Sequence, residues 1–162
     1  MNSIYTFLDS NNIPYERFDH PAAFTCQQAD EVCPKMPGAS IKNLFLYDKK
    51  TDQHFLVVVG KEKQVDLKQL KFMLGVSNLS FASEERMLKY LGVTPGSVTV
   101  LGLINDIMQA VTVIFDSNLK DKTLQCHPLV NTATLAIPFE GIKAFLTLTQ
   151  HNYDFLDIPT RS

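Results

Sequence analysis

Hydrophobic and polar residues along this chain follow two different periods. Alternation with period two and short apolar runs, both typical of strands, occur at residues 15–21, 41–61, 97–104, 110–116 and 126–137. Within residues 41–61, two apolar runs are joined by the polar stretch DKKTDQ, which predicts a β-hairpin. Most of the expected secondary structure is therefore β.

Helical patterns separate these strands. Helices are expected at residues 3–11, 25–32, 64–75, 83–92 and 141–152. Thr25 and Gln28 form a T-x-x-Q capping box for the second of them. Gly75 and Gly92 suit left-handed turns at the ends of two others. No internal repeat, linker or low-complexity tract interrupts the pattern, so residues 1–162 are expected to form one α+β domain, a mixed sheet or partly closed barrel flanked by helices.

The composition supports a globular protein with a substantial core. The 162 residues are 45% hydrophobic and 20% charged. The longest aliphatic and aromatic run, FLVVV at residues 55–59, is far shorter than a membrane span, and the first residues lack the pattern of a signal peptide. Three irregularly spaced cysteines suit reduced thiols better than a disulfide framework. We therefore expect a cytoplasmic protein without a membrane segment.

Several kinds of chemistry lack their sequence signatures. No GxGxxG follows a strand, and GxxxxGK[ST] and GxSxG are absent, which argues against dinucleotide, nucleoside-triphosphate and α/β-hydrolase sites. The four histidines occur in no CxxC or HExxH spacing, so neither a metal nor a cofactor is expected. Cys126 and His127 are adjacent, but neighbouring strand residues point to opposite faces. A small buried cysteine is therefore favoured over a thiol nucleophile with its base.

Positive charge is concentrated in one segment of the chain. The formal net charge of −2 argues against a nucleic-acid coat over the whole surface. Residues 35–71 nevertheless contain eight of the 15 Lys and Arg residues against four acids, a local net charge of +4. A solvated lysine-rich face is the simpler interpretation, and a local nucleic-acid contact stays open.

Lys42 and Asn43 stand at the start of the apolar strand IKNLFLY. Alternation places Lys42 on the face of Leu44 and Leu46, and Asn43 on the other face. One interpretation of Lys42 is a strand-end side chain that extends its amine into water. The other is a cationic anchor for a phosphate or a polarised carbonyl at the mouth of a pocket, beside an amide that orients the ligand.

Five motifs together resemble a known family. They are H-P-x-x-x-T at residues 20–25, P-G-x-x-x-K-N-L-F-L at 37–46, L-G-V-T-P-G-S-V-T at 91–99, I-N-D at 104–106 and H-P-L-V-N-T-A-T at 127–134. In this order and spacing, over nearly the whole chain, they are similar to the YbaK/prolyl-tRNA editing family. The second and last motifs most resemble the free-standing deacylases that clear alanine mischarged onto proline tRNA. The relatives that remove cysteine are a weaker match.

The resemblance implies a YbaK-like fold that hydrolyses the ester between an amino acid and the terminal adenosine of tRNA. It implies that Lys42 holds the terminal nucleotide, that Asn43 and His127 shape and polarise the site, and that the loop at Gly96 supplies backbone N–H groups. The implied substrate site also contains Thr25, Ser97 and Asn131. Because an aminoacyl ester is already activated, such an enzyme needs positioning and oxyanion stabilisation more than a strong nucleophile.

The implied partner is the acceptor end of mischarged tRNA(Pro), above all alanyl-tRNA(Pro), and prolyl-tRNA synthetase is a further candidate; DNA and membranes are not expected. Two alternatives stay open: a non-catalytic module that binds tRNA or a synthetase, and a deacylase for cysteinyl- or seryl-tRNA.

The chain departs from the family at one position of its loop pattern G-x-x-x-P, since Val100 here stands where the family has proline after Gly96. Proline fixes φ and removes a donor, so the loop geometry is open to question.

Overall fold

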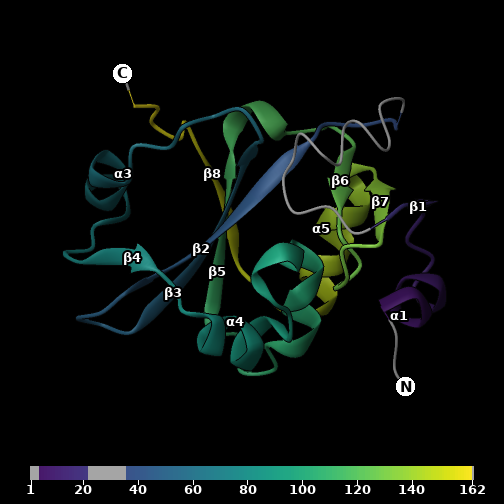
Figure 1. Cartoon of the computed structure of the whole chain (residues 1–162), viewed down its shortest axis with the longest axis horizontal. Helices are drawn as coiled ribbons and strands as arrows, with labels where there is room; N and C mark the ends of the chain where they lie inside the picture. The colour runs from purple at the N-terminus through teal and green to yellow at the C-terminus, as the bar shows by residue number, and fades with distance from the viewer. Residues whose placement is uncertain (1–3, 22–35, 162) are drawn as a thin grey trace.

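The computed structural model describes residues 4–21 and 36–161 as an α+β fold, which confirms the expected class (Figure 1). The helices are α1 (Ile4–Ser10), α3 (Leu67–Leu74), α4 (Glu84–Leu91) and α5 (Phe139–Leu148). The strands are β1 (Glu16–Asp19), β2 (Ile41–Asp48), β3 (Gln53–Gly60), β4 (Leu79–Phe81), β5 (Val111–Asp116), β6 (Leu124–Cys126), β7 (Ala133–Ile137) and β8 (Tyr153–Leu156). Three 3₁₀ turns are η1 (Pro95–Ser97), η2 (Val100–Asn105) and η3 (Ser117–Leu119). In this part of the chain no helix is long and apolar enough to cross a membrane.

The described strands form two sheets and no closed barrel. A five-stranded sheet has the order β4-β2-β3-β5-β8, and a three-stranded sheet has the order β1-β7-β6. The predicted hairpin is confirmed, because β2 and β3 pair antiparallel with Lys42 opposite Val59. Strand β5 runs parallel to both of its neighbours, so the larger sheet is mixed, as expected from the sequence.

The two sheets meet just before β2 begins. Ala39 forms a parallel bridge with Leu124, its N–H donates to the carbonyl of Thr123 at 2.8 Å, and its carbonyl accepts from the N–H of Gln125 at 3.1 Å. Gly38 permits this approach, because it has φ of 96° and a Cβ there would lie 2.9 Å from the Thr123 carbonyl oxygen. This bridge, which we call the join between the two sheets, places the start of β2 beside β6.

The β2–β3 hairpin separates two apolar clusters. On one face, Phe45 and Leu56 pack in a large core with Leu91 of α4, residues of η2, β6 and β7, and Phe145 of α5. On the other face, Leu46 belongs to a smaller cluster that includes Leu70 of α3. Because side chains alternate along β2, neighbouring residues at the start of this strand point to opposite faces.

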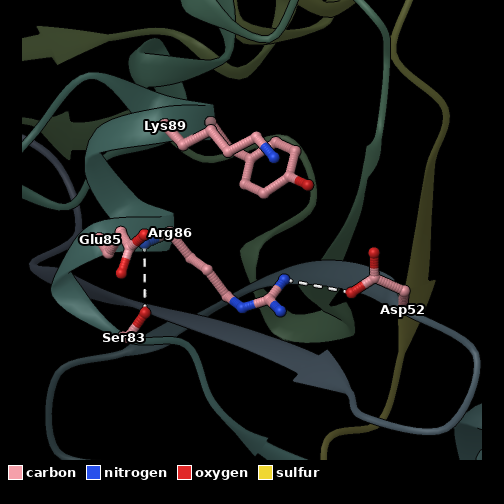
Figure 2. A pocket seen from close by; sticks show the side chains of 6 residues that line it. Asp52, Ser83, Glu85, Arg86 and Lys89 are labelled. Atoms are coloured by element: carbon pink, nitrogen blue, oxygen red, sulfur yellow. Dashed lines mark hydrogen bonds and ion pairs between the residues drawn. The ribbon is translucent and has the colours of Figure 1, made fainter.

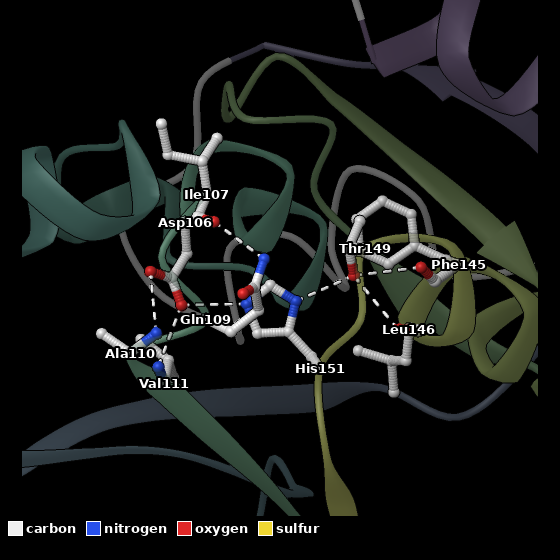
Figure 3. Close-up of polar contacts among 9 residues, drawn as sticks. All are labelled: Asp106, Ile107, Gln109, Ala110, Val111, Phe145, Leu146, Thr149 and His151. Carbon is white, nitrogen blue, oxygen red and sulfur yellow. Dashed lines mark hydrogen bonds and ion pairs between the residues drawn. The ribbon is translucent and has the colours of Figure 1, made fainter.

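Asp106 and His151 form a buried polar network between η2 and the chain that follows α5 (Figure 3). The carboxylate accepts a hydrogen bond from Nε2 of His151 at 2.9 Å, and from the backbone N–H groups of Ala110 and Val111 at 3.1 and 2.9 Å. Nδ1 of His151 lies 2.8 Å from the hydroxyl of Thr149. The network therefore ties two segments, about 45 residues apart in sequence, through side chains.

The prediction of a strand at residues 97–104 is wrong, because this segment lies in the 3₁₀ turns η1 and η2 and the link between them. Thr99 caps η2, since its hydroxyl accepts the N–H of Leu101 at 3.2 Å and its carbonyl accepts that of Gly102 at 3.0 Å. An apolar run of this length fits any fully buried segment, so periodicity alone does not distinguish a strand from a turn of helix.

The prediction of one continuous strand at residues 126–137 is also wrong, because a loop interrupts it. Strand β6 ends at Cys126, and β7 begins only at Ala133. Between them Pro128 has no N–H to pair, and Leu129 has φ of 69°, which a strand does not allow. The short strands β4 and β8 were not predicted. The predicted helix at residues 25–32 lies outside the described residues, whereas the other four are present, and Gly75 and Gly92 have the expected left-handed φ of 70° and 67°.

Candidate functional site

Residues of three motifs converge at the join between the two sheets. The start of β2 carries Lys42 and Asn43, and the loop between β6 and β7 carries His127 and Asn131. The turn η1 carries Gly96, where an added Cβ would lie 3.4 Å from Nδ2 of Asn131. The structure therefore places Gly96 next to Asn131, although the two residues are far apart in sequence.

His127 presents a neutral imidazole at this place. Its Nδ1 lies 3.2 Å from the carbonyl oxygen of Ala133, and since a carbonyl only accepts, Nδ1 carries the proton. Burial lowers the pKa of His127 below its ordinary value, nearby His20 lowers it further, and the hydrogen bond to Ala133 opposes both. At neutral pH, Nε2 is therefore unprotonated and able to accept a hydrogen bond or a proton.

His20 fixes the C-terminal end of the His127 loop, a role that was not predicted. Its backbone N–H donates to the carbonyl of Thr132 at 2.9 Å. Its Nδ1 donates to the carbonyl of Pro21 at 2.9 Å, so that Nε2 accepts from the hydroxyl of Thr134 at 2.8 Å. The only sequence signal for this role was the presence of His20 in the motif H-P-x-x-x-T.

Asn43 has an unused hydrogen-bond acceptor in its side chain. Its Oδ1 is buried, and no partner for it exists among residues 4–21 and 36–161. Leaving such a group unpaired costs about 1–3 kcal/mol, so buried unpaired oxygens are rare and often face a ligand. Asn43 lies on the β2 face that carries Phe45, toward the larger core and the second sheet.

Lys42 lies on the opposite face of β2 from Asn43. It is half-buried and shares its face with Leu44 and Leu46. In the described part of the chain its ammonium has neither an ion pair nor a hydrogen bond. The expected alternation is thus correct, and the two residues of the K-N pair do not point to the same side of the strand.

The η1 turn limits which backbone groups are free for a ligand. Ser97 is buried, and its N–H already donates to the carbonyl of Thr94 at 2.9 Å. Gly96 is exposed, and its φ is not positive. The glycine is therefore not required by the backbone conformation, and a Cβ at this position would lie in ordinary contact with the Asn131 amide, whereas a larger side chain would crowd it. Val100, at the position of the family's proline, is the buried first residue of η2.

Cys126 is a core residue, as expected from the sequence. Its side chain is 1% exposed and lies within the larger apolar core. Burial raises the pKa of its thiol to about 12, so the thiolate is not formed at neutral pH. Thr25, which was also assigned to the substrate site, lies outside the described residues.

Known proteins resemble this chain over most of its length. The prolyl-tRNA editing protein ProX of Acetoanaerobium sticklandii is 34% identical over 152 residues, which cover 93% of each chain. Prolyl-tRNA synthetase associated domain-containing protein 1 of Danio rerio is 36% identical over 148 residues, 90% of this chain and 80% of the relative. A crystal structure of a proposed trans-editing enzyme for prolyl tRNA synthetase shares the fold, with a TM-score of 0.74 at 17% identity over 98% of this chain and 95% of the other. Residues 20–145 match the model of the aminoacyl-tRNA editing domain, and the chain therefore belongs to that family.

Proposed function

We propose that this protein is a trans-editing deacylase that hydrolyses the ester of mischarged tRNA(Pro), with alanyl-tRNA(Pro) as its preferred substrate. The observation that carries the proposal is the neutral imidazole of His127, held by Ala133, in the same loop as Asn131, whose amide lies next to Gly96 of the η1 turn. Membership in the editing family and the name of the ProX relative support it.

In the proposed reaction, Nε2 of His127 accepts a proton from a water molecule as the water oxygen attacks the ester carbonyl. The carbonyl oxygen becomes an oxyanion, which the backbone N–H of Gly96 and the amide of Asn131 stabilise. The bond to the ribose oxygen then breaks, and that oxygen takes up the proton from His127. The products are the free amino acid and tRNA, and no cofactor is consumed.

The remaining site residues bind the substrate. Oδ1 of Asn43 accepts a hydrogen bond from the α-ammonium group of the amino acid, which supplies the partner that this oxygen lacks. Lys42 holds the phosphate of the terminal nucleotide, because its long side chain at the start of β2 can reach around the edge of the sheet. We assign Thr25 and Ser97 to substrate binding as well, because they belong to the motifs that resemble the editing family.

We further propose that the protein acts in the cytoplasm and that prolyl-tRNA synthetase is its second partner. The name of the Danio rerio relative, which refers to that synthetase, supports the proposed partner. The acceptor end of mischarged tRNA(Pro) remains the principal partner.

The test is a comparison of proline tRNA charged separately with alanine, serine, cysteine and proline. Alanyl ester should be lost faster than prolyl ester, because a small pocket can exclude the larger ring by steric clash. Equal loss of both esters, or no loss above the uncatalysed rate, would contradict the proposal. Binding of the tRNA without hydrolysis would point instead to a non-catalytic module.

A further inference from the structure

A polar hollow outside the candidate site is shown in Figure 2. It occupies about 210 Å³ between the β2–β3 turn and the start of α4, and its lining residues are Asp52, Ser83, Glu85, Arg86, Lys89 and Tyr90. Pockets for whole small molecules occupy about 300–1,000 Å³. The size of this hollow therefore suits one unit of a longer ligand, the rest of which lies in solvent.

Arg86 is held in a fixed position at the hollow. Its Nη1 donates to Oδ1 of Asp52 at 3.1 Å and to Nε2 of His54 at 2.9 Å. Its guanidinium lies 4.1 Å from the ring centre of Tyr47, and its side chain is only 32% exposed. A cation fixed in this way loses little conformational entropy when a ligand binds.

His54 accounts for the orientation of Arg86. Its ring is buried and lies 4.3 Å from that of Tyr90 and 5.8 Å from that of Tyr47. Burial lowers the pKa of His54, and the charge of Arg86 lowers it further, so the neutral ring offers Nε2 as an acceptor. Both hydrogens of Nη1 are thus used, while the N–H groups of Nε and Nη2 have no partner among residues 4–21 and 36–161.

The groups around the hollow are of the kinds that bind the phosphate, base and ribose of a ribonucleotide. The free edge of Arg86 and the ammonium of Lys89, which has no ion pair within the described residues, can bind a phosphate. The ring of Tyr90 and the guanidinium plane can stack against a base. Glu85 is exposed and can accept a hydrogen bond from a ribose hydroxyl.

The hollow lies within reach of the candidate site along the same strand. Tyr47 and Asn43 share a face of β2 four residues apart, which corresponds to about 13 Å at about 3.3 Å per residue. Helix α4 starts at the hollow with Ser83 as its cap and ends at Gly92, just before the η1 turn that carries Gly96. A single strand of a few nucleotides can therefore span both places.

We propose that this hollow binds an unpaired cytidine of the -CCA end of tRNA while the esterified terminal adenosine occupies the candidate site. The inference rests on the proposed function, because it places the rest of the same substrate. Arg86 contributes its guanidinium plane and free N–H groups, and Lys89 contributes a charge for the backbone phosphate.

The first experiment measures binding of a fluorescent CCA trinucleotide and of adenosine monophosphate to the wild type, Arg86→Lys and Lys89→Ala. Each substitution should weaken binding of the trinucleotide by roughly tenfold and leave binding of the monophosphate unchanged. Lys120→Ala is the matched control, because Lys120 is also an exposed lysine near an aromatic ring, that of Phe155, but lies outside the hollow. It should bind both ligands like the wild type.

The second experiment measures single-turnover hydrolysis of alanyl-tRNA(Pro) and of 3′-alanyl-adenosine. Lys89→Ala should slow hydrolysis of the tRNA ester by roughly tenfold at subsaturating enzyme and leave the adenosine ester unaffected. Equal losses on both esters would indicate a general structural role and overturn the inference, as would variants that bind the trinucleotide like the wild type. If the wild type hydrolyses neither ester but the variants still lose trinucleotide binding, the proposed function fails and the binding site stands.

Discussion

Replacement of Asp106 by asparagine removes the charge from the buried network with His151 while it keeps the shape of the side chain. The carboxylate accepts three hydrogen bonds, from His151 and from the N–H groups of Ala110 and Val111. An amide has a single oxygen acceptor, and its NH₂ group would face at least one of these donors. The variant therefore loses both a charge-assisted hydrogen bond and the pairing of a buried N–H.

The magnitude follows from these two losses. A hydrogen bond to a charged group contributes about 1.5–3 kcal/mol, and an unpaired buried donor costs about 1–3 kcal/mol. Because the two losses overlap, we expect Asp106→Asn to lower the free energy of unfolding by about 3 kcal/mol. For a chain of 162 residues this corresponds to a decrease in Tm of about 6–12 °C. Urea titration and thermal unfolding measure the two quantities, and Asp157→Asn, at an exposed site, is the control.

The pH dependence tests the same reasoning. Burial raises the pKa of Asp106, but the hydrogen bonds from His151, Ala110 and Val111 together more than offset it, so the pKa lies below its ordinary value of 3.8. A carboxyl with a lowered folded-state pKa stabilises the fold above its unfolded-state pKa and loses this contribution as the pH falls through the folded-state value. The difference between wild type and variant should thus be constant near pH 7 and shrink below about pH 4. A decrease under 1 kcal/mol at pH 7, or a difference that grows in acid, would refute the argument.

The remaining predictions concern the candidate site and the buried Cys126. Lys42→Ala should fold normally by circular dichroism and lower kcat/KM on alanyl-tRNA(Pro) by about tenfold or more; unchanged kinetics would leave Lys42 as a strand-end lysine in water. Cys126→Ala should keep the deacylation rate within a few-fold of wild type, since the thiol is buried and protonated, and a collapse of turnover in the folded variant would identify a nucleophile. Gly96→Val should lower the single-turnover rate, because its methyl groups crowd the amide of Asn131, whereas Val100→Pro should fold as well as wild type and react at an equal or higher rate, because a helix tolerates proline at its first residue. The single-turnover rate should fall in acid with a midpoint below 6.5, because burial lowers the pKa of His127 and only its unprotonated form accepts a proton; a midpoint above 7 would exclude this role.

The sequence predicted local structure well where short-range signals are strong. The β2–β3 hairpin followed from two apolar runs around a polar turn, and the end of α4 followed from Gly92. The alternation that separates Lys42 from Asn43 was also correct, because β2 is regular over its whole length. Where apolar runs are buried on all sides, as in η2, the pattern carries no period, and the prediction of a strand there was wrong.

Long-range contacts of the candidate site were beyond sequence reasoning. The proximity of Gly96 to Asn131 depends on how two segments far apart in sequence fold together, and the burial of Oδ1 of Asn43 depends on tertiary packing around the start of β2. His20 was visible only as part of a motif, because its role lies in hydrogen bonds to residues more than 100 positions later. Local propensity and periodicity contain no information about such partners.

The smaller sheet determines when the site can form during synthesis of the chain. Among residues 4–21 and 36–161, strand β1 at residues 16–19 pairs with β7 at residues 133–137 alone, and Ala39 forms its bridge with Leu124. Such pairs of high sequence separation form late in folding, because a large loop must first close. While the chain emerges from a ribosome, the β2–β3 hairpin can form alone, with Asn43 open to water. The candidate site is therefore completed only after β7 at residues 133–137 has been made, and a shorter nascent chain lacks the sheet that positions His127 and Asn131.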